Sequence, residues 1–150
     1  MPPGKLESLR LVMEQAIPFN RLLGFRLEAA AEGRAQGRFD FKDDLVGNPL
    51  TRVLHGGVIA AVLDVIGACA VVSTFQEEAP LAGMGTVDLR VDFLRPGAGQ
   101  HFIATGQVMR PGRILSASRM ELHNDRKVLI AMGTAIYRVS RKAEQAPPNL

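Results

Sequence analysis

The chain has 150 residues, 47% of them hydrophobic and 22% charged, which is the size and composition of one soluble globular domain rather than of a disordered chain. Residues 1–75 carry 8 basic and 8 acidic side chains, and residues 76–150 carry 10 basic and 7 acidic ones, so the whole formal charge of +3 lies in the second half. This small bias is compatible with a phosphorylated ligand. Aromatic residues make up only 5% and tryptophan is absent, which argues against a protein that binds nucleic acid.

Few side chains are suited to reactive chemistry. The single cysteine, Cys69, excludes an intramolecular disulfide framework and a multi-cysteine zinc site, and we expect it to be a small buried hydrophobe. The three histidines are widely spaced and no glycine-rich phosphate loop is present, so we expect neither a metal nor a separate cofactor. The longest apolar stretch, residues 58–72, is too short to span a bilayer. Because the N-terminus also lacks a signal-peptide core, we expect a cytoplasmic protein that does not enter a membrane.

Hydrophobic patterning in the first half predicts one surface helix, a hairpin and one long helix. Residues 5–17 place apolar side chains at helical spacing, and the proline that follows ends the pattern. Two strand-like pieces within residues 25–41 flank a predicted turn at 32–33. Residues 43–54 show no period and are predicted to form a loop. Residues 56–74 are predicted to form a helix that is apolar around its circumference and therefore buried on nearly all sides.

The second half predicts an antiparallel sheet. After a predicted loop at 77–85, residues 86–93 alternate strictly between apolar and polar side chains. Three further strand patterns follow at 101–109, 114–123 and 128–139, joined by short turns that only antiparallel neighbours allow. The last of them is apolar on both faces, as a central strand would be, and residues 142–150 are expected to be a disordered tail. The order of elements predicts a single α+β domain over residues 1–150, with one antiparallel sheet against one dominant helix.

Asp64 is the only carboxylate in the long apolar helix. Burying an unpaired carboxylate costs several kcal/mol and Asp is a poor helix former, so we expect a function there; a structural Asp paired with an arginine is the alternative. Small side chains share its face and would let a backbone or a thin ligand approach: Gly57, Ala60, Ala61, Gly67, Ala68 and Val71. The other face is expected to pack on the sheet: Ile59, Val62, Leu63, Ile66 and Ala70.

The triplet His55-Gly56-Gly57 precedes or begins this helix. The first turn of a helix has unsatisfied N–H groups, and the two glycines leave them open to a ligand oxygen, as a polarised carbonyl or an oxyanion requires. The alternatives are a histidine that only caps the helix and glycines that only form a tight turn. Asp64 lies two turns further along, so a carbonyl held at the helix tip is not necessarily within its reach, and a neighbouring subunit could supply the missing half.

Asn48, the His55-Gly56-Gly57 triplet and Leu63-Asp64 together resemble the signature of the hotdog-fold acyl-CoA thioesterases of the PaaI-like type. The resemblance covers residues 18–140, including the strand that starts at 85 and ends in the sequence FLRP at 93–96. It implies a hotdog fold, in which a single antiparallel sheet wraps around one long central helix. It also implies hydrolysis of an acyl- or aryl-CoA thioester to a free acid and CoA.

The same resemblance implies roles for individual residues. Asp64 would be the catalytic carboxylate, acting as the nucleophile or as a general base on water. The Gly56 N–H would polarise the thioester carbonyl, and His55 and Asn48 would position that carbonyl or the leaving sulfur. Thr86 would hold the attacking water.

Family members are dimers or tetramers with active sites across the dimer interface, so the resemblance implies a homodimer or a dimer of dimers. Coenzyme A would be part of the substrate, bound near Gly57, with its phosphates at Arg95, Arg110 and Arg113; a solvated turn is the alternative for the last two. A hotdog module that binds acyl-CoA without catalysis is the alternative function.

Overall fold

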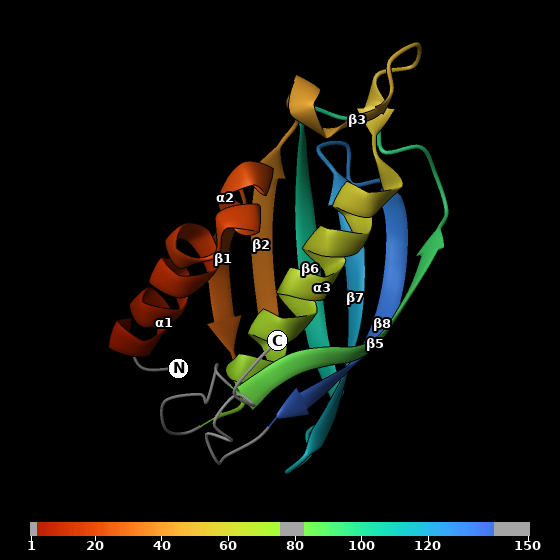
Figure 1. Ribbon diagram of the computed structural model, residues 1–150. Coiled ribbons are helices and arrows are strands. Elements are labelled where there is room, and N and C mark those ends of the chain that lie inside the picture. Colours follow the sequence, from red (N-terminus) through yellow and green to blue (C-terminus); the bar gives the residue numbers. More distant parts are fainter. Residues whose placement is uncertain (1–2, 76–82, 140–150) are drawn as a thin grey trace, which may run out of the picture.

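The computed structural model describes residues 3–75 and 83–139, and its main element is a six-stranded antiparallel sheet with the strand order β1-β2-β6-β7-β8-β5 (Figure 1). The strands are β1 Arg26–Ala31, β2 Arg34–Asp40, β5 Met84–Phe93, β6 His101–Arg110, β7 Leu115–Asn124 and β8 Leu129–Val139. Strands β6, β7 and β8 follow one another as neighbours, which confirms the predicted meander. β8 lies between β7 and β5, so the prediction of a central strand is also confirmed.

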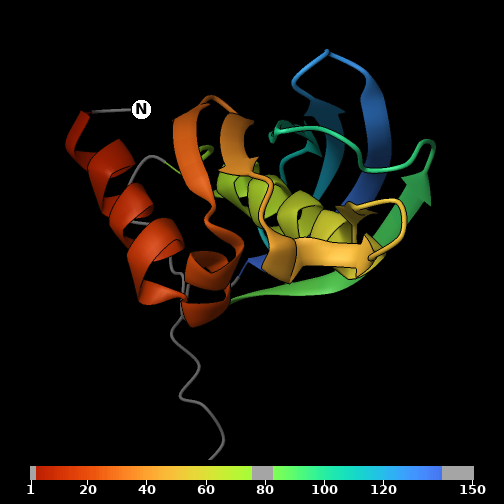
Figure 2. The same ribbon diagram turned by 90° about the horizontal axis from the view of Figure 1, so that it is seen from above.

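The long helix α3, Gly56–Val72, packs against one face of this sheet, and the strands curve around it (Figures 1 and 2). The side chains predicted to face the sheet are at most 3% exposed: Ile59, Val62, Leu63, Ile66 and Ala70. Burying these apolar groups is the main stabilising contribution of the helix. The predicted architecture, one antiparallel sheet wrapped around a long helix, is confirmed.

The opposite face of α3 differs in part from the prediction. Asp64 and its small neighbours Gly57, Ala60, Ala61 and Ala68 are exposed or half-buried, so the helix is not buried on all sides. Gly67 and Val71, predicted in the same open stripe, are buried. Gly67 comes three residues after Asp64, which places it about 60° around the helix and turns it towards the sheet.

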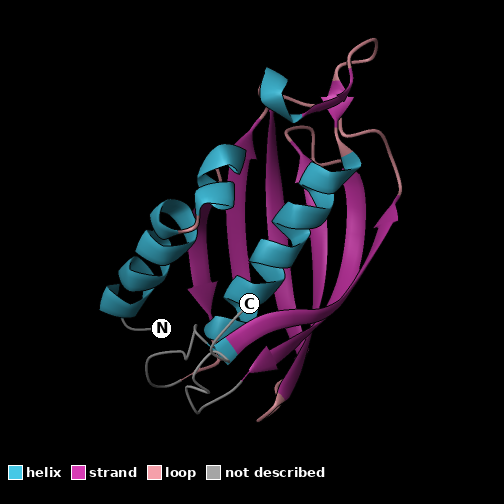
Figure 3. Ribbon diagram, in the orientation of Figure 1, coloured by secondary structure: helices cyan, strands magenta, loops and turns pink. Residues whose placement is uncertain are grey.

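The N-terminal segment is more helical than the sequence pattern predicts (Figure 3). It contains α1 Pro3–Arg10, the π-helical segment η1 Leu11–Ala16 and α2 Pro18–Leu23. The predicted helix at 5–17 corresponds to α1 and η1, with Leu9 and Met13 in the core. Pro18 starts a further helix because proline fits the first helical position, where its missing N–H is not needed.

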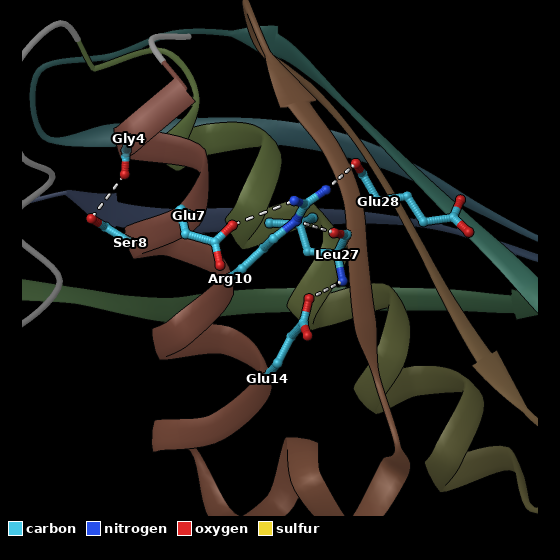
Figure 4. Close-up of polar contacts among 7 residues, drawn as sticks. All are labelled: Gly4, Glu7, Ser8, Arg10, Glu14, Leu27 and Glu28. Atoms are coloured by element: carbon cyan, nitrogen blue, oxygen red, sulfur yellow. Dashed lines mark hydrogen bonds and ion pairs between the residues drawn. The ribbon is translucent and has the colours of Figure 1, made fainter.

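Arg10 and Glu14 fasten this segment to the outer edge of β1 (Figure 4). The Arg10 guanidinium donates to the main-chain oxygens of Leu27 and Glu28, each at 2.8 Å. The Glu14 carboxylate accepts from the Leu27 N–H, also at 2.8 Å. An edge strand otherwise presents unpaired N–H and C=O groups, so these two side chains close part of the β1 edge.

Two connections can be compared with their predictions. Residues 43–54, predicted as a loop, contain the 3₁₀ turn η2 Asp43–Leu45 and a small sheet of β3 Val46–Asn48 and β4 Val53–Leu54. Strands this short show no period, so the loop prediction is wrong there. The turn at 32–33 is confirmed, with φ of 49° and 78° as a two-residue hairpin requires. Residues 77–82 and the predicted tail at 142–150 lie outside the described residues.

β5 forms the other edge of the sheet, and among the described residues its outer side has no neighbouring strand. It is ten residues long, and the side chains of Val87 and Phe93 are 61% and 56% exposed. A long, partly apolar edge is a template for pairing with another chain. The two edges of the sheet are therefore unlike: side chains close part of one, and no described strand pairs with the other. No helix in the described part of the chain has the length and hydrophobicity to cross a membrane.

Candidate active site

Asp64 and Thr86, both predicted site residues, meet where the start of β5 lies against α3. The Thr86 hydroxyl donates to Asp64 Oδ1 at 2.8 Å. Asp64 is near the middle of α3 on its half-exposed side, and Thr86 is the third residue of β5. Within residues 3–75 and 83–139 the carboxylate forms no ion pair with an arginine and accepts no other side-chain hydrogen bond. Its orientation is therefore fixed by Thr86, while Oδ2 stays open to another donor.

Tyr137 reaches the same residue from the neighbouring strand. Its hydroxyl donates to the main-chain oxygen of Asp64 at 2.8 Å, and the side chain is 1% exposed. In the pairing of β5 with β8, Tyr137 is the register partner of Thr86. Burial raises the pKa of Tyr137, so the phenol remains protonated and acts as a donor. Tyr137 is the only tyrosine in the chain, but no local sequence pattern marks it as a site residue.

At the tip of α3, where the sequence predicts that an oxygen binds, one N–H is already in use. His55 precedes the helix with φ −64° and ψ 138°, and its Nδ1 accepts the Gly57 N–H at 2.9 Å. The histidine therefore caps the helix through Nδ1. The Gly56 N–H donates to no acceptor among the described residues. Of the two glycines, Gly56 is thus the one whose N–H is available to a ligand.

A groove of about 390 Å³ opens beside this helix tip. Apolar residues make up most of its lining, which consists of Val53, Leu54, Gly56, Ile59, Phe93, Leu94, Arg95, Pro96 and Gly97. A Cβ placed on Gly56 would lie 3.5 Å from the Phe93 ring, so the end of β5 borders the open N–H. Arg95, a predicted phosphate ligand, lies in the same groove and donates from Nη1 to the Leu129 oxygen at 3.0 Å. Phe93 was missed as a site residue because an apolar residue at a strand end carries no functional signal.

Three other predicted residues form no hydrogen bond or ion pair with Asp64, Thr86, His55 or Gly56 in the described part of the chain. The Asn48 side chain is exposed and accepts from the main-chain N–H groups of Leu50 and Thr51 at 2.9 and 3.4 Å, which stabilises its own turn. Arg110 and Arg113 are exposed at the β6–β7 connection. The strand registers place this connection at the opposite end of the sheet from the groove. A role for these three residues in the site stays a prediction.

The arrangement thus has two halves with different chemistry. A carboxylate with one open oxygen can act as a base or as a nucleophile, and an open N–H at a helix N-terminus can polarise a carbonyl. Gly56 and Asp64 are eight residues apart, about 12 Å along the helix axis at 1.5 Å per residue. One carbonyl group cannot reach both within a single chain. Among the described residues no group of three or more His, Cys, Asp or Glu side chains lies close enough to hold a metal ion.

Comparisons with known proteins identify the family of the chain. The family model of the thioesterase superfamily matches residues 52–131, more than half of the chain, including the helix tip, Asp64 and Thr86. The medium/long-chain acyl-CoA thioesterases YigI of Escherichia coli K12 and Salmonella typhimurium LT2 are each 42% identical over 146 residues, covering 89% of this chain and 94% of their own.

Solved structures extend the likeness to the fold. A Shewanella oneidensis protein related to the thioesterase superfamily superposes with a TM-score of 0.83 at 37% identity, covering 93% of this chain and all of its own. The Escherichia coli PaaI protein of the phenylacetic acid degradation operon has a TM-score of 0.77 at 23% identity, covering 91% of this chain and 94% of its own, and shows the shared fold alone. The chain belongs to the thioesterase superfamily and has the hotdog fold.

Proposed function

We propose that this protein hydrolyses acyl-CoA thioesters to a free acid and CoA. The observation that carries the proposal is the Asp64 carboxylate, which is held by the Thr86 hydroxyl at 2.8 Å on the half-exposed side of α3. Membership of the thioesterase superfamily supports a hydrolytic role for that carboxylate. The names of the YigI relatives favour medium- and long-chain acyl groups over aryl groups as substrates.

The proposed reaction uses Asp64 as a general base. The Thr86 hydroxyl donates its proton to Oδ1, so its lone pairs remain available to accept a hydrogen bond from water. A water held between Thr86 and the open Oδ2 would give its proton to the carboxylate as it attacks the thioester carbon. The Gly56 N–H would stabilise the oxyanion that develops on the carbonyl oxygen. Collapse of this intermediate would break the C–S bond, and the proton held by Asp64 would pass to the sulfur, so that CoA leaves as the thiol. His55 would face the carbonyl or the leaving sulfur with Nε2, because Nδ1 caps the helix.

A second copy of the chain would bring the two halves of the site together through β5. This strand starts beside Asp64, through Thr86, and ends beside Gly56, through Phe93. In a two-fold antiparallel pair of β5 strands, the start of one strand lies beside the end of the other. Asp64 of one copy would then approach Gly56 of the other. The open edge of β5 and the exposed side chain of Val87 support this pairing.

The same pairing would gather the predicted phosphate ligands. Within one chain Arg95 is at the helix-tip end of the sheet, whereas Arg110 and Arg113 are at the other end. A two-fold axis through β5 reverses the second copy, so its β6–β7 connection would lie towards the end that holds Arg95 of the first. Arginine is well suited to phosphate oxygens because its planar guanidinium binds them with two parallel hydrogen bonds.

The test is a panel of acyl-CoA substrates of increasing chain length, together with one aryl-CoA, followed through release of the CoA thiol by wild type and by Asp64→Asn. We expect turnover on medium or long acyl chains and a loss of about 10²–10⁴-fold in kcat for Asp64→Asn. Circular dichroism serves as the control for folding. Equal kcat for the two proteins would refute the role of Asp64. Saturable binding of acyl-CoA without any thiol release would instead identify a non-catalytic binding module.

A further inference from the structure

We infer that Tyr137 is a positioning residue for the Asp64 carboxylate and that it acts through the main chain of α3. Tyr137 donates to the main-chain oxygen of Asp64, and Thr86 donates to the carboxylate of the same residue, both at 2.8 Å. The inference rests on the proposed function, because it assigns Tyr137 a part in the reaction that Asp64 carries out.

The register of the sheet explains why these two hydroxyls act on one residue. Thr86 on β5 and Tyr137 on β8 are direct cross-strand partners. The local break in register between Thr86 and Asp88 marks an irregularity at this point of β5, and such irregularities re-aim side chains. Asp64 is therefore held at both ends by two neighbouring residues of the sheet. A rotation or a slide of α3 relative to β5 would break one of these bonds or both.

Gly67 provides the room for the phenol. A Cβ on Gly67 would lie 2.2 Å from the Tyr137 hydroxyl oxygen and 2.9 Å from Met120 Sδ. Real Cβ atoms do not approach other atoms that closely, so the hydroxyl reaches the carbonyl of Asp64 only because residue 67 has no side chain. The hydrogen bond to Asp64 therefore requires two separate features: a glycine on the sheet side of α3 that leaves space, and a buried phenol on β8 that donates.

Packing alone does not account for the hydroxyl. A phenylalanine would fill the space of the Tyr137 ring, and a buried hydroxyl without a partner costs free energy. Burial raises the pKa of Tyr137, so the group remains a hydrogen-bond donor under ordinary conditions. The hydroxyl fixes the position of one main-chain carbonyl of α3, that of Asp64.

This role predicts a specific change in the kinetics. Because Tyr137 is 1% exposed, we expect its hydroxyl to contribute nothing to the binding of CoA. Without the hydroxyl, α3 gains freedom at residue 64, and the carboxylate spends less time in line with Thr86. Because misplacement of a reacting group lowers the rate of the chemical step, Tyr137→Phe should lower kcat and leave KM unchanged.

The structure offers a matched control in Ser118 on β7. Its hydroxyl is also buried, at 1% exposure, and also donates to a carbonyl of α3, that of Gly67, at 3.3 Å. Tyr137→Phe and Ser118→Ala therefore each remove one buried hydrogen bond between the sheet and the same helix. Only Tyr137→Phe removes the bond at Asp64. A general loosening of α3 would affect both variants alike.

The experiment measures kcat and KM of wild type, Tyr137→Phe, Ser118→Ala, Thr86→Val and the Tyr137→Phe/Thr86→Val pair on the best acyl-CoA of the panel. We expect kcat of Tyr137→Phe to fall about tenfold with KM within about twofold of wild type, and Ser118→Ala to stay within about twofold in both. In the Thr86→Val background the effect of Tyr137→Phe on kcat should largely disappear, because Thr86→Val alone already leaves the Asp64 carboxylate unaligned.

A conservative variant guards against a mere folding defect. Tyr137 is the only tyrosine in the chain, so growth on 3-fluorotyrosine changes this residue alone while keeping its ring and its hydroxyl. That protein should retain most of the wild-type kcat, unlike Tyr137→Phe.

Three results would overturn the inference: wild-type kcat in Tyr137→Phe, an equal loss in Ser118→Ala, or full additivity with Thr86→Val. Suppose that wild type hydrolyses acyl-CoA, that Asp64→Asn is inactive, and that Tyr137→Phe hydrolyses acyl-CoA at the wild-type rate. In that case only the role of Tyr137 fails. If wild type hydrolyses none of the acyl-CoA substrates, the proposed function fails and the role of Tyr137 fails with it.

Discussion

Gly56→Pro removes one N–H from the tip of α3 and should leave the helix intact. Proline is favoured at the first helical position, where its φ of about −65° is already helical. His55, the residue before it, has φ −64° and ψ 138°, which is the extended conformation that a residue before proline requires. Since the Gly56 N–H donates to no acceptor in the described part of the chain, the substitution breaks no hydrogen bond there.

We expect the substitution to lower the rate of the chemical step. Loss of one donor to a developing oxyanion lowers kcat by about 10²–10³-fold, or about 2.7–4 kcal/mol. Release of the CoA thiol at saturating acyl-CoA measures kcat, and far-UV circular dichroism checks that the helix is retained.

Gly56→Ala is the matched control, because it adds a side chain and keeps the N–H. Its Cβ would lie 3.5 Å from the Phe93 ring, an ordinary contact, so kcat should stay within about threefold of wild type. Wild-type kcat in Gly56→Pro would refute the assignment of this N–H. An equal loss in Gly56→Ala would show that the shape of the groove matters and the N–H does not.

Three further predictions concern the scaffold. Cys69 is fully buried, and burial raises the pKa of its thiol to about 12. At about pH 8, Ellman's reagent should therefore detect this thiol only after the protein is unfolded in guanidinium. Fast labelling of the native protein would contradict this burial. The double variant Arg10→Ala/Glu14→Ala frees main-chain groups at the β1 edge. Light scattering should therefore show association of the protein into larger oligomers or aggregates. A molar mass equal to that of wild type would mean that other contacts close this edge. Gly67→Ala should lower the free energy of urea unfolding by about 1–3 kcal/mol, and by less in a Tyr137→Phe background; equal losses in both backgrounds would show that the phenol is not what Gly67 accommodates.

The elements that the sequence predicts well are those with a clear period. The strict alternation at 86–93 corresponds to β5, and the apolar side chains that face the sheet from α3 are those expected from helical spacing. Asp64 stands out because it is the only carboxylate in an apolar helix, and the structure places Thr86, another predicted site residue, beside it. Local chemistry of this kind is visible in the sequence because each signal depends on a few adjacent residues.

The features that the sequence does not predict depend on contacts between residues far apart in the chain, which no local pattern indicates. The partnership of Tyr137, Gly67 and Asp64 requires the register of β8 and the rotation of α3, which only the fold supplies. Pro18 indicates a helix end and a helix start equally well, so α2 was missed. Asp64 is not the buried, unpaired charge that the sequence predicts, because the residue is half-buried and accepts a hydrogen bond from Thr86.

A purified heterodimer of Asp64→Asn and Gly56→Pro subunits tests the central claim, that each site takes its carboxylate from one copy and its helix tip from the other. Each variant alone should be nearly inactive. In the heterodimer, one of the two sites would combine both defects and the other would have none, so kcat per dimer should recover to about half of the wild-type value. If each site is built from a single chain, both sites of the heterodimer carry one defect. Activity no higher than that of the variant homodimers would therefore contradict the shared site.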